Sequence, residues 1–316
     1  MNLQTQIPLQ KQAHHQIDYS SKLFLLGSCF SENIGKLLSY YKLQSVENPF
    51  GILFHPKAIE NLIINAINAK EYTQEDIFEL NERWHSFDAH SELSATSKEE
   101  LIENLTSAIK LTQEQIANAT HVIITLGTAW VYRYISSDSI VANCHKVPQK
   151  QFLKELLSVD EISESLESIC ELIKSVNPKA SILFTVSPVR HLKDGFIENQ
   201  QSKSHLIAGI HNVVEPRKNI HYFPSYEIMM DELRDYRFYK EDMIHPNKTA
   251  INYIWEKFVY TWFTESSLAT MKLVEEIQKG LTHKPFNPNS EAHQKFLEKL
   301  ALKQEQLKQE FSFIKF

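Results

Sequence analysis

The chain has 316 residues, of which 42% are hydrophobic and 23% are charged, and its formal net charge at pH 7 is −6. This length suits one large α/β domain or two small ones, and the composition is that of an ordinary globular protein. Charges of both signs are mixed along the chain, without a basic stripe that could neutralise a phosphate backbone, so we do not expect nucleic-acid binding.

The N-terminal segment and the cysteines bear on the location of the protein. The first twenty residues are polar and lack the apolar segment of a secretory signal, and no apolar run approaches the length needed to span a bilayer. Cys29, Cys144 and Cys170 are scattered and fit neither a disulfide framework nor a paired metal motif. These features predict a cytoplasmic protein that does not bind membranes.

Four short apolar runs predict the strands of a parallel sheet. They span 22–26, 121–126, 181–186 and 219–223, and a glycine or proline follows each of them closely. Helical spacing of apolar residues occurs among and after these runs, at 31–41, 56–68, 98–117, 159–175, 201–214 and 247–263. Strands alternating with helices predict βαβ units with helices on both faces of the sheet. Ligands of such sheets bind outside the carboxyl ends of the strands.

We expect one α/β domain over residues 1–266. The segment 69–97 is less regular and is interpreted as an insertion that borders the site. Residues 267–316 read as two amphipathic helices with a polar break at 282–289. We interpret this tail as a packing appendage or as the interface of a homodimer.

A serine stands at the first strand-to-helix turn, in GlySerCysPhe at 27–30. At such a turn the Ser28 hydroxyl is lifted into the cleft, and its backbone N–H points where an oxyanion would develop, aided by the helix N-terminus. The alternative is a serine that only caps the helix. Cys29 is a rival nucleophile, although buried cysteines usually act as small hydrophobic residues.

A second motif, AspMetIleHisPro at 242–246, precedes the predicted helix 247–263. Asp242 and His245 are one turn apart, so the carboxylate could accept from one imidazole nitrogen while the other nitrogen faces a nucleophile. The alternative is a capping aspartate beside an ordinary histidine. The combination of this pair with Ser28, each at a predicted loop–helix junction, favours a catalytic site.

This order of motifs resembles that of the SGNH (GDSL-like) hydrolases and, within that superfamily, the GSCFA family. The resemblance covers about residues 20–265 and rests on five motifs in order: GlySerCysPheSer (27–31), AsnProPheGly (48–51), LeuGlyThrAlaTrpValTyr (126–132), SerProValArgHis (187–191) and AspMetIleHisPro (242–246). It implies a flavodoxin-like three-layer α/β/α sandwich and acyl-ester chemistry without a cofactor. It also implies that Ser28 is the nucleophile, Asp242 the orienting acid and His245 the base, and that the Gly51 N–H joins the Ser28 N–H in the oxyanion hole.

One position departs from the superfamily pattern. SGNH enzymes usually place an oxyanion-binding asparagine two residues after the third-block glycine, and here that residue is Ala129. Thr128 or a different loop donor could replace it, or the oxyanion hole could consist of backbone donors alone, and of the side chains we favour Thr128. Loss of one such donor commonly lowers the rate by ~10²–10³-fold, so a weak esterase, a transferase and a non-catalytic relative stay open.

Several polar and aromatic residues are candidate substrate ligands. Arg190 and His191 could bind an anionic or polyhydroxylated group of the substrate. An ion pair between Arg190 and a structural carboxylate explains the arginine equally well. Asn48, which opens the second motif, is a further candidate. A sugar-stacking wall, as opposed to core packing, could be formed by Trp130, Tyr132 and Trp84.

Five histidines are candidate ligands of a metal site, but their spacing in the sequence does not support one. No HxH, HExxH or CxxC pattern includes any of His55, His85, His90, His145 or His191. We therefore expect no metal. The sequence predicts a serine-dependent acyl-ester hydrolase or acyltransferase that acts through an acyl-enzyme on a small polar or carbohydrate ester. The alternatives are a non-catalytic SGNH-like binding protein and a metal-dependent phosphoesterase.

Overall fold

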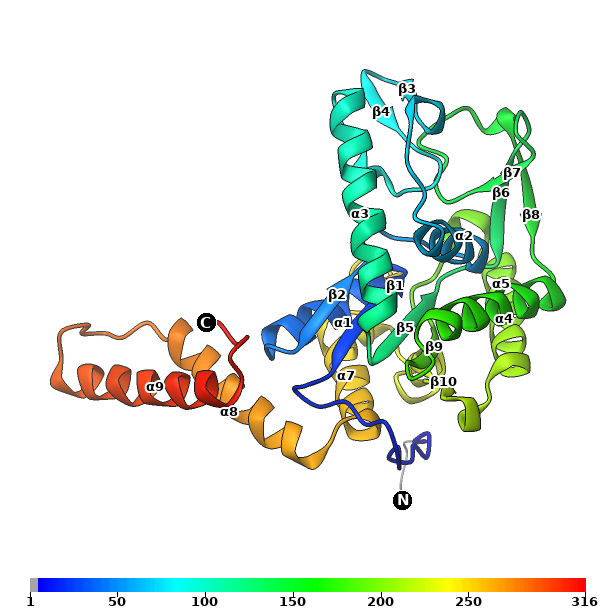
Figure 1. Cartoon of the computed structure of the whole chain (residues 1–316). Helices are drawn as coiled ribbons and strands as arrows, with labels where there is room; N and C mark the ends of the chain where they lie inside the picture. Colours follow the sequence, from blue (N-terminus) through cyan, green and yellow to red (C-terminus); the bar gives the residue numbers. More distant parts are fainter. Residues whose placement is uncertain (1–4) are drawn as a thin grey trace.

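A computed structural model describes residues 5–316 and has a parallel five-stranded sheet at its centre (Figure 1). The strand order is β10–β9–β5–β1–β2. Numbered along the chain within this sheet alone, the order is 2-1-3-4-5, which is the flavodoxin-like arrangement. The strands are β1 (Lys22–Gly27), β2 (Gln44–Glu47), β5 (His121–Leu126), β9 (Ser181–Val186) and β10 (Ile220–Tyr222).

Helices cover both faces of this sheet, because successive side chains of each strand point to opposite sides. In β1, Leu23 and Leu25 belong to one hydrophobic cluster, and Phe24 and Leu26 belong to the other. The first cluster includes α1 (Cys29–Tyr40) and α7 (Lys248–Trp262). The second includes α2 (Pro56–Ile67), α3 (Lys98–Asn118), α4 (Val159–Val176) and α5 (Phe196–Val213). The predicted three-layer α/β/α sandwich is confirmed.

Strand β2 is the one central strand that the apolar runs do not predict. All four of its residues are only half-buried, and Val46 is the only aliphatic one. An edge strand pairs on one side only, here in parallel register with β1 from Lys22–Gln44 to Leu25–Glu47. Its sequence therefore lacks the continuous apolar run of a buried strand.

Two smaller antiparallel sheets lie beyond the central one. The first has the order β7–β6–β8 and consists of β6 (Trp130–Tyr134), β7 (Ser139–Val141) and β8 (Phe152–Leu156). The second is the hairpin of β3 (Phe78–Leu80) and β4 (Arg83–His85), within the segment interpreted above as an insertion. The first sheet begins directly after β5, at the carboxyl edge of the main sheet, and the hairpin lies between α2 and α3 in the chain.

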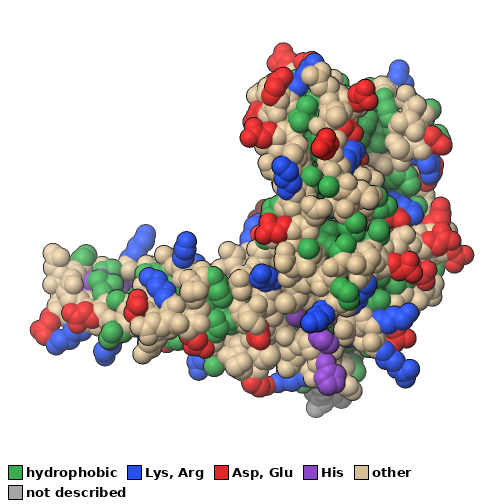
Figure 2. Space-filling view, viewed as in Figure 1, with side chains coloured by type: hydrophobic (Ala, Val, Ile, Leu, Met, Phe, Trp, Pro, Cys, Tyr) green, Lys and Arg blue, Asp and Glu red, His purple; other side chains and the backbone are tan. Residues whose placement is uncertain are grey.

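The C-terminal segment forms the two expected helices, α8 (Glu265–Thr282) and α9 (Glu291–Glu310). Figure 1 shows this pair projecting from the body of the molecule, and Figure 2 shows hydrophobic side chains among charged ones on its surface. Leu300 and Leu307 of α9 are buried. Within residues 5–316, none of the helices has the length and apolar character that a membrane crossing requires.

Candidate active site

The turn after β1 depends on a glycine. Gly27 has φ +127°, and a Cβ atom built on it would lie 2.1 Å from the carbonyl oxygen of Thr125. No other residue fits so close to the neighbouring strand. The chain can therefore turn directly from β1 into α1, which places Ser28 at the carboxyl edge of the sheet.

Ser28 is the N-cap of α1 and is fully buried. Its Oγ accepts a hydrogen bond from the N–H of Phe30 at 3.3 Å. Its own N–H donates to the carbonyl oxygen of Thr125 at 3.0 Å, which extends the pairing of β1 with β5 by one residue. The sequence predicts an exposed hydroxyl and a free N–H at Ser28, whereas in this structure the hydroxyl is buried and the N–H is hydrogen-bonded. The position at a helix N-terminus is as expected.

The Asp–His pair adopts the expected geometry. His245 Nδ1 lies 2.7 Å from Asp242 Oδ2, while Asp242 Oδ1 accepts from the N–H groups of Ile244 and His245, each at 2.9 Å. These three hydrogen bonds lower the pKa of Asp242 to about 2, so the carboxylate is ionised at neutral pH. The other imidazole nitrogen, Nε2, is left for a further partner. Both side chains are more than 40% exposed.

Arg190 holds the loop that carries this pair. Its backbone N–H donates to Ile244 O at 3.4 Å, and its guanidinium donates to Met243 O at 3.0 Å. The guanidinium also lies 4.2 Å from the ring centroid of Tyr239. Arg190 follows β9, so it joins the end of that strand to the Asp242–His245 loop. These contacts are neither of the two alternatives that the sequence left open, a substrate anion or a structural carboxylate.

Ser28 and His245 reach the same edge of the sheet but are not hydrogen-bonded to each other in the described chain. His191 occupies the region around them. Its Nε2 would lie 3.0 Å from a Cβ on Gly127, the residue that follows β5. Burial, Lys203 and His245 lower the pKa of His191 to about 3, so this imidazole is neutral at physiological pH.

The expected oxyanion donors are already engaged. The N–H of Gly51 donates to Asn48 O at 2.8 Å, and His90 packs against Gly51, where an added Cβ would lie 2.5 Å from the His90 Cβ. The Thr128 hydroxyl accepts from the Trp130 N–H at 3.0 Å and lies 3.1 Å from the Ser202 hydroxyl. The roles assigned to Gly51 and Thr128 therefore stay predictions, and each would require a rearrangement of the loop that carries the residue.

Lys203 is a residue that the sequence reasoning missed. This lysine of α5 is fully buried, and its Nζ donates to Gly127 O at 2.6 Å and to Ser187 O at 2.8 Å. It thus connects the carboxyl ends of β5 and β9. None of the ion pairs within residues 5–316 involves it, and burial lowers its pKa to about 7. Its spacing from Leu206 and Ile210 on the buried stripe of α5 was the available signal.

Cys29 is the alternative nucleophile next to the serine. It is half-buried, and burial and the charge of Glu32 raise the pKa of its thiol. A raised pKa lowers the fraction of reactive thiolate at neutral pH. The thiol is therefore a poorer candidate than its position beside Ser28 suggests.

The histidines considered for a metal site make structural contacts. His55 caps α2 by accepting from the Ala58 N–H, and its other nitrogen contacts Val141 O. His85 contacts Ser94 and Leu80, and a ring nitrogen of His145 lies 2.7 Å from Ser86 O. Within residues 5–316, no three His, Cys, Asp or Glu side chains are grouped as a metal site would require.

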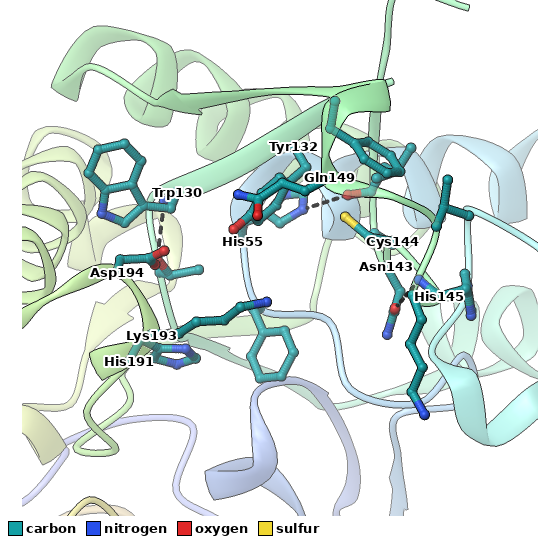
Figure 3. A pocket seen from close by; sticks show the side chains of 17 residues that line it. His55, Trp130, Tyr132, Asn143, Cys144, His145, Gln149, His191, Lys193 and Asp194 are labelled. Carbon is teal, nitrogen blue, oxygen red and sulfur yellow. Dashed lines mark hydrogen bonds between the residues drawn. The ribbon is translucent and has the colours of Figure 1, made fainter. Parts of the chain in front are cut away.

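A pocket of about 420 Å³ opens beside the strand ends. Figure 3 shows Trp130 and Asp194 toward one side of it and Asn143, Cys144 and His145 toward the other. His191 and Thr128 also line this pocket, which connects it with the residues at the ends of β5 and β9. Its size is typical of small-molecule sites.

Of the three aromatic residues predicted to form a sugar-stacking wall, Trp130 and Tyr132 line this pocket and Trp84 does not. The indole N–H of Trp130 donates to Glu198 O at 3.2 Å. The Nζ of Lys154 lies 4.3 Å from the Trp130 ring centroid and 2.6 Å from Asp194. An amine and a carboxylate therefore stand beside the aromatic surface.

The fold and the site together define a doubly wound α/β protein whose chemistry-bearing residues gather at the carboxyl edge of its sheet. Residues 22–258 match the GSCFA family, and the chain belongs to that family. Residues 274–316 match the GSCFA domain protein, C-terminal domain. A search of curated proteins found no significant match.

Among solved structures, the chain is similar to a carbohydrate esterase family 3 protein from Talaromyces cellulolyticus. The similarity has a TM-score of 0.35 at 9% identity and covers 81% of this chain and 99% of that one. A similarity this low does not bear on activity.

Proposed function

We propose that the protein is a serine-dependent acyl-ester hydrolase or acyltransferase of the SGNH type that acts on a small polar or carbohydrate ester. The observation that carries the proposal is the Asp242–His245 pair, joined at 2.7 Å. Arg190, which follows β9, holds the loop that carries this pair, and Ser28, the N-cap of α1, follows β1, so both lie beyond the carboxyl ends of parallel strands. Nucleophile, base and orienting acid are the parts that acyl transfer by a serine requires.

In the proposed reaction, Asp242 fixes the His245 tautomer so that Nε2 accepts the proton of the Ser28 hydroxyl. Ser28 Oγ attacks the ester carbonyl, and the N-terminus of α1 stabilises the negative charge that develops there. The leaving alkoxide takes the proton from His245, and water or a second hydroxyl then resolves the acyl-enzyme. Because Ser28 is fully buried, this reaction requires the side chains that cover it to move when substrate binds.

The pocket beside the site supports a polar substrate with an apolar face. Trp130 and Tyr132 offer ring surfaces, and Lys193 and Asp194 add a charge of each sign. Stacking on aromatic rings with polar groups at the rim is a general means of holding a sugar or a similar polyhydroxylated molecule. The acyl group and the acceptor are not part of the proposal.

Hydrolysis of a simple aryl acetate tests the proposal. We expect Ser28→Ala to abolish turnover and Asp242→Asn to lower kcat by about 10³–10⁴-fold, because the wrong tautomer of His245 then predominates. Cys29→Ala is the matched control on the same turn and should retain activity. Equal rates for the wild type and Ser28→Ala would contradict the proposal, and loss of activity in Cys29→Ala alone would assign the reaction to the thiol.

One observation favours a second candidate function. Ser28 is fully buried and makes no hydrogen bond with His245 in this conformation. A binding protein that retains the fold without turnover would have such a serine as a helix cap. In that case a carbohydrate ester would bind with the same affinity to the wild type and to Ser28→Ala and would remain intact.

A further inference from the structure

The three donors expected for the oxyanion hole have partners already, so a carbonyl oxygen at Ser28 would meet few free N–H groups. The Ser28 N–H is bound to Thr125 O, and the Gly51 N–H is bound to Asn48 O. The Thr128 hydroxyl accepts from the Trp130 N–H and lies 3.1 Å from the Ser202 hydroxyl, a partner to which it can donate its own proton. An oxyanion needs at least one donor that the protein does not satisfy itself.

Asn48 carries such a donor. Its Oδ1 accepts from the Gly27 N–H at 2.9 Å, which fixes the side-chain amide next to the residue before Ser28. Its Nδ2 is buried, and among residues 5–316 it has no hydrogen-bond partner of normal distance and angle. Asn48 as a whole is only 9% exposed. A buried donor without a partner destabilises the folded state, so its presence requires an explanation.

The backbone fixes the direction of this amide. Asn48 has φ +44°, a left-handed conformation that asparagine tolerates better than most residues. Its N–H donates to Leu25 O, so the residue follows β2 directly and lies beside the end of β1. Asn48 and the Ser28 turn therefore follow the carboxyl ends of two neighbouring strands, β2 and β1.

We propose that the Asn48 side chain is an oxyanion donor of this site and replaces the amide that the superfamily pattern would place at Ala129. This inference rests on the proposed function. When Ser28 Oγ bonds to the ester carbonyl carbon, the π electrons of the C=O bond move to the carbonyl oxygen, and the serine proton passes to His245. The Nδ2–H of Asn48 donates to that oxygen until the C=O bond re-forms and the alkoxide leaves with the proton.

Glu32 is the competing partner within the protein. Burial and the charge of Glu92 raise the pKa of its carboxyl, and a hydrogen-bonding contact with the Asn48 side chain lowers it, so the amide faces this carboxylate. The contact does not reach the distance and angle of a normal hydrogen bond, and among residues 5–316 it leaves Nδ2 unsatisfied. If the only role of the amide were to bind Glu32, Asn48 would have no function once that carboxylate is removed.

The substitution Asn48→Asp separates the donor from the acceptor. Aspartate keeps an oxygen for the Gly27 N–H and tolerates the same backbone conformation, but at pH 8 it lacks the N–H donor. We expect kcat for aryl acetate hydrolysis to fall by about 10²–10³-fold with KM changed little, and phosphonylation of Ser28 by a fluorophosphonate to slow in parallel. Burial of the added charge beside Glu32 should lower the melting temperature, so kcat is compared per folded molecule.

Two further variants provide the controls. Asn48→Gly removes the whole side chain without straining the turn and should lose activity to a similar extent. Glu32→Gln should retain activity. If the wild type is active and Asn48→Asp keeps full activity, this inference is wrong but the proposed function stands. The same holds if Glu32→Gln loses as much activity as Asn48→Asp. A wild type that neither hydrolyses the ester nor takes the probe would overturn the proposed function as well.

Discussion

Replacement of Lys203 by methionine should change how the stability of the protein depends on pH. The lysine is fully buried and bound to two carbonyl oxygens, with no carboxylate partner among residues 5–316. Burial of a cation without a counter-ion is unfavourable. This is why its pKa falls from 10.5 to about 7.

The sign and size of the effect follow from these two pKa values. Between pH 7 and 10.5 the unfolded chain keeps the lysine proton and the folded chain has released it, so the free energy of unfolding rises with pH across this window. Each pH unit contributes about 1.4 kcal/mol. Below pH 7 both states are protonated, and the whole cost of burial, on the order of 5 kcal/mol, is present.

Urea denaturation at pH 7 and pH 9 measures this effect. From pH 7 to pH 9 the wild type should gain about 2 kcal/mol in free energy of unfolding relative to Lys203→Met, less than two full units of slope because the folded lysine is half protonated at pH 7. Because Cys29 lies near Lys203 and also titrates, both proteins should carry Cys29→Ala. Lys174→Met, at a less buried lysine, is the matched control and should show a much smaller change. Parallel pH profiles for wild type and Lys203→Met would refute the reasoning.

Two further predictions concern Thr128 and the buried histidines. Because the Thr128 hydroxyl accepts from the Trp130 N–H, Thr128→Val should lower the free energy of unfolding by about 1–3 kcal/mol. The variant should keep kcat per folded molecule within a few-fold of wild type. A large loss of kcat at unchanged stability would show instead that Thr128 belongs to the oxyanion hole. The protein should also lose stability as the pH falls from 6.5 toward 4, by up to about 1.4 kcal/mol per unit for each histidine that stays neutral only in the folded state. A melting temperature independent of pH over this range would contradict the burial of these histidines, whose folded pKa values are about 3 to 4: His55, His145 and His191.

The fold was largely predictable because its strands are buried on both faces. Residues 121–126 and 181–186 are fully buried strands, and their apolar runs specify them without any knowledge of their neighbours. The edge strand β2 was not predictable in this way, because half-buried residues leave no such run. The helix bounds were close for the same reason: apolar spacing reports the face that meets the sheet.

The site was predictable only in part, because hydrogen-bond partners depend on strand pairing. The Asp242–His245 contact is local, so its spacing in the sequence sufficed. The Ser28 N–H is engaged by Thr125, a residue on another strand that no motif names. Lys203 could not be distinguished from a surface lysine by residue type alone, although it interrupts an apolar stripe.

The role of Arg190 illustrates the same limit. The sequence left a substrate anion and a structural carboxylate as its partners, and the structure gives it a backbone carbonyl and an aromatic ring instead. Neither of these two contacts can be predicted from the spacing of residues in the sequence. The predicted homodimer through α8 and α9 and the cytoplasmic location stay predictions.

Mass spectrometry after incubation with a fluorophosphonate tests the central claim most directly, because only an activated serine acquires the adduct. The account predicts one phosphonyl group per chain, on the peptide that contains Ser28, with labelling suppressed in Asp242→Asn. An unlabelled protein, or an adduct confined to another residue, would contradict the claim that Ser28 is the nucleophile.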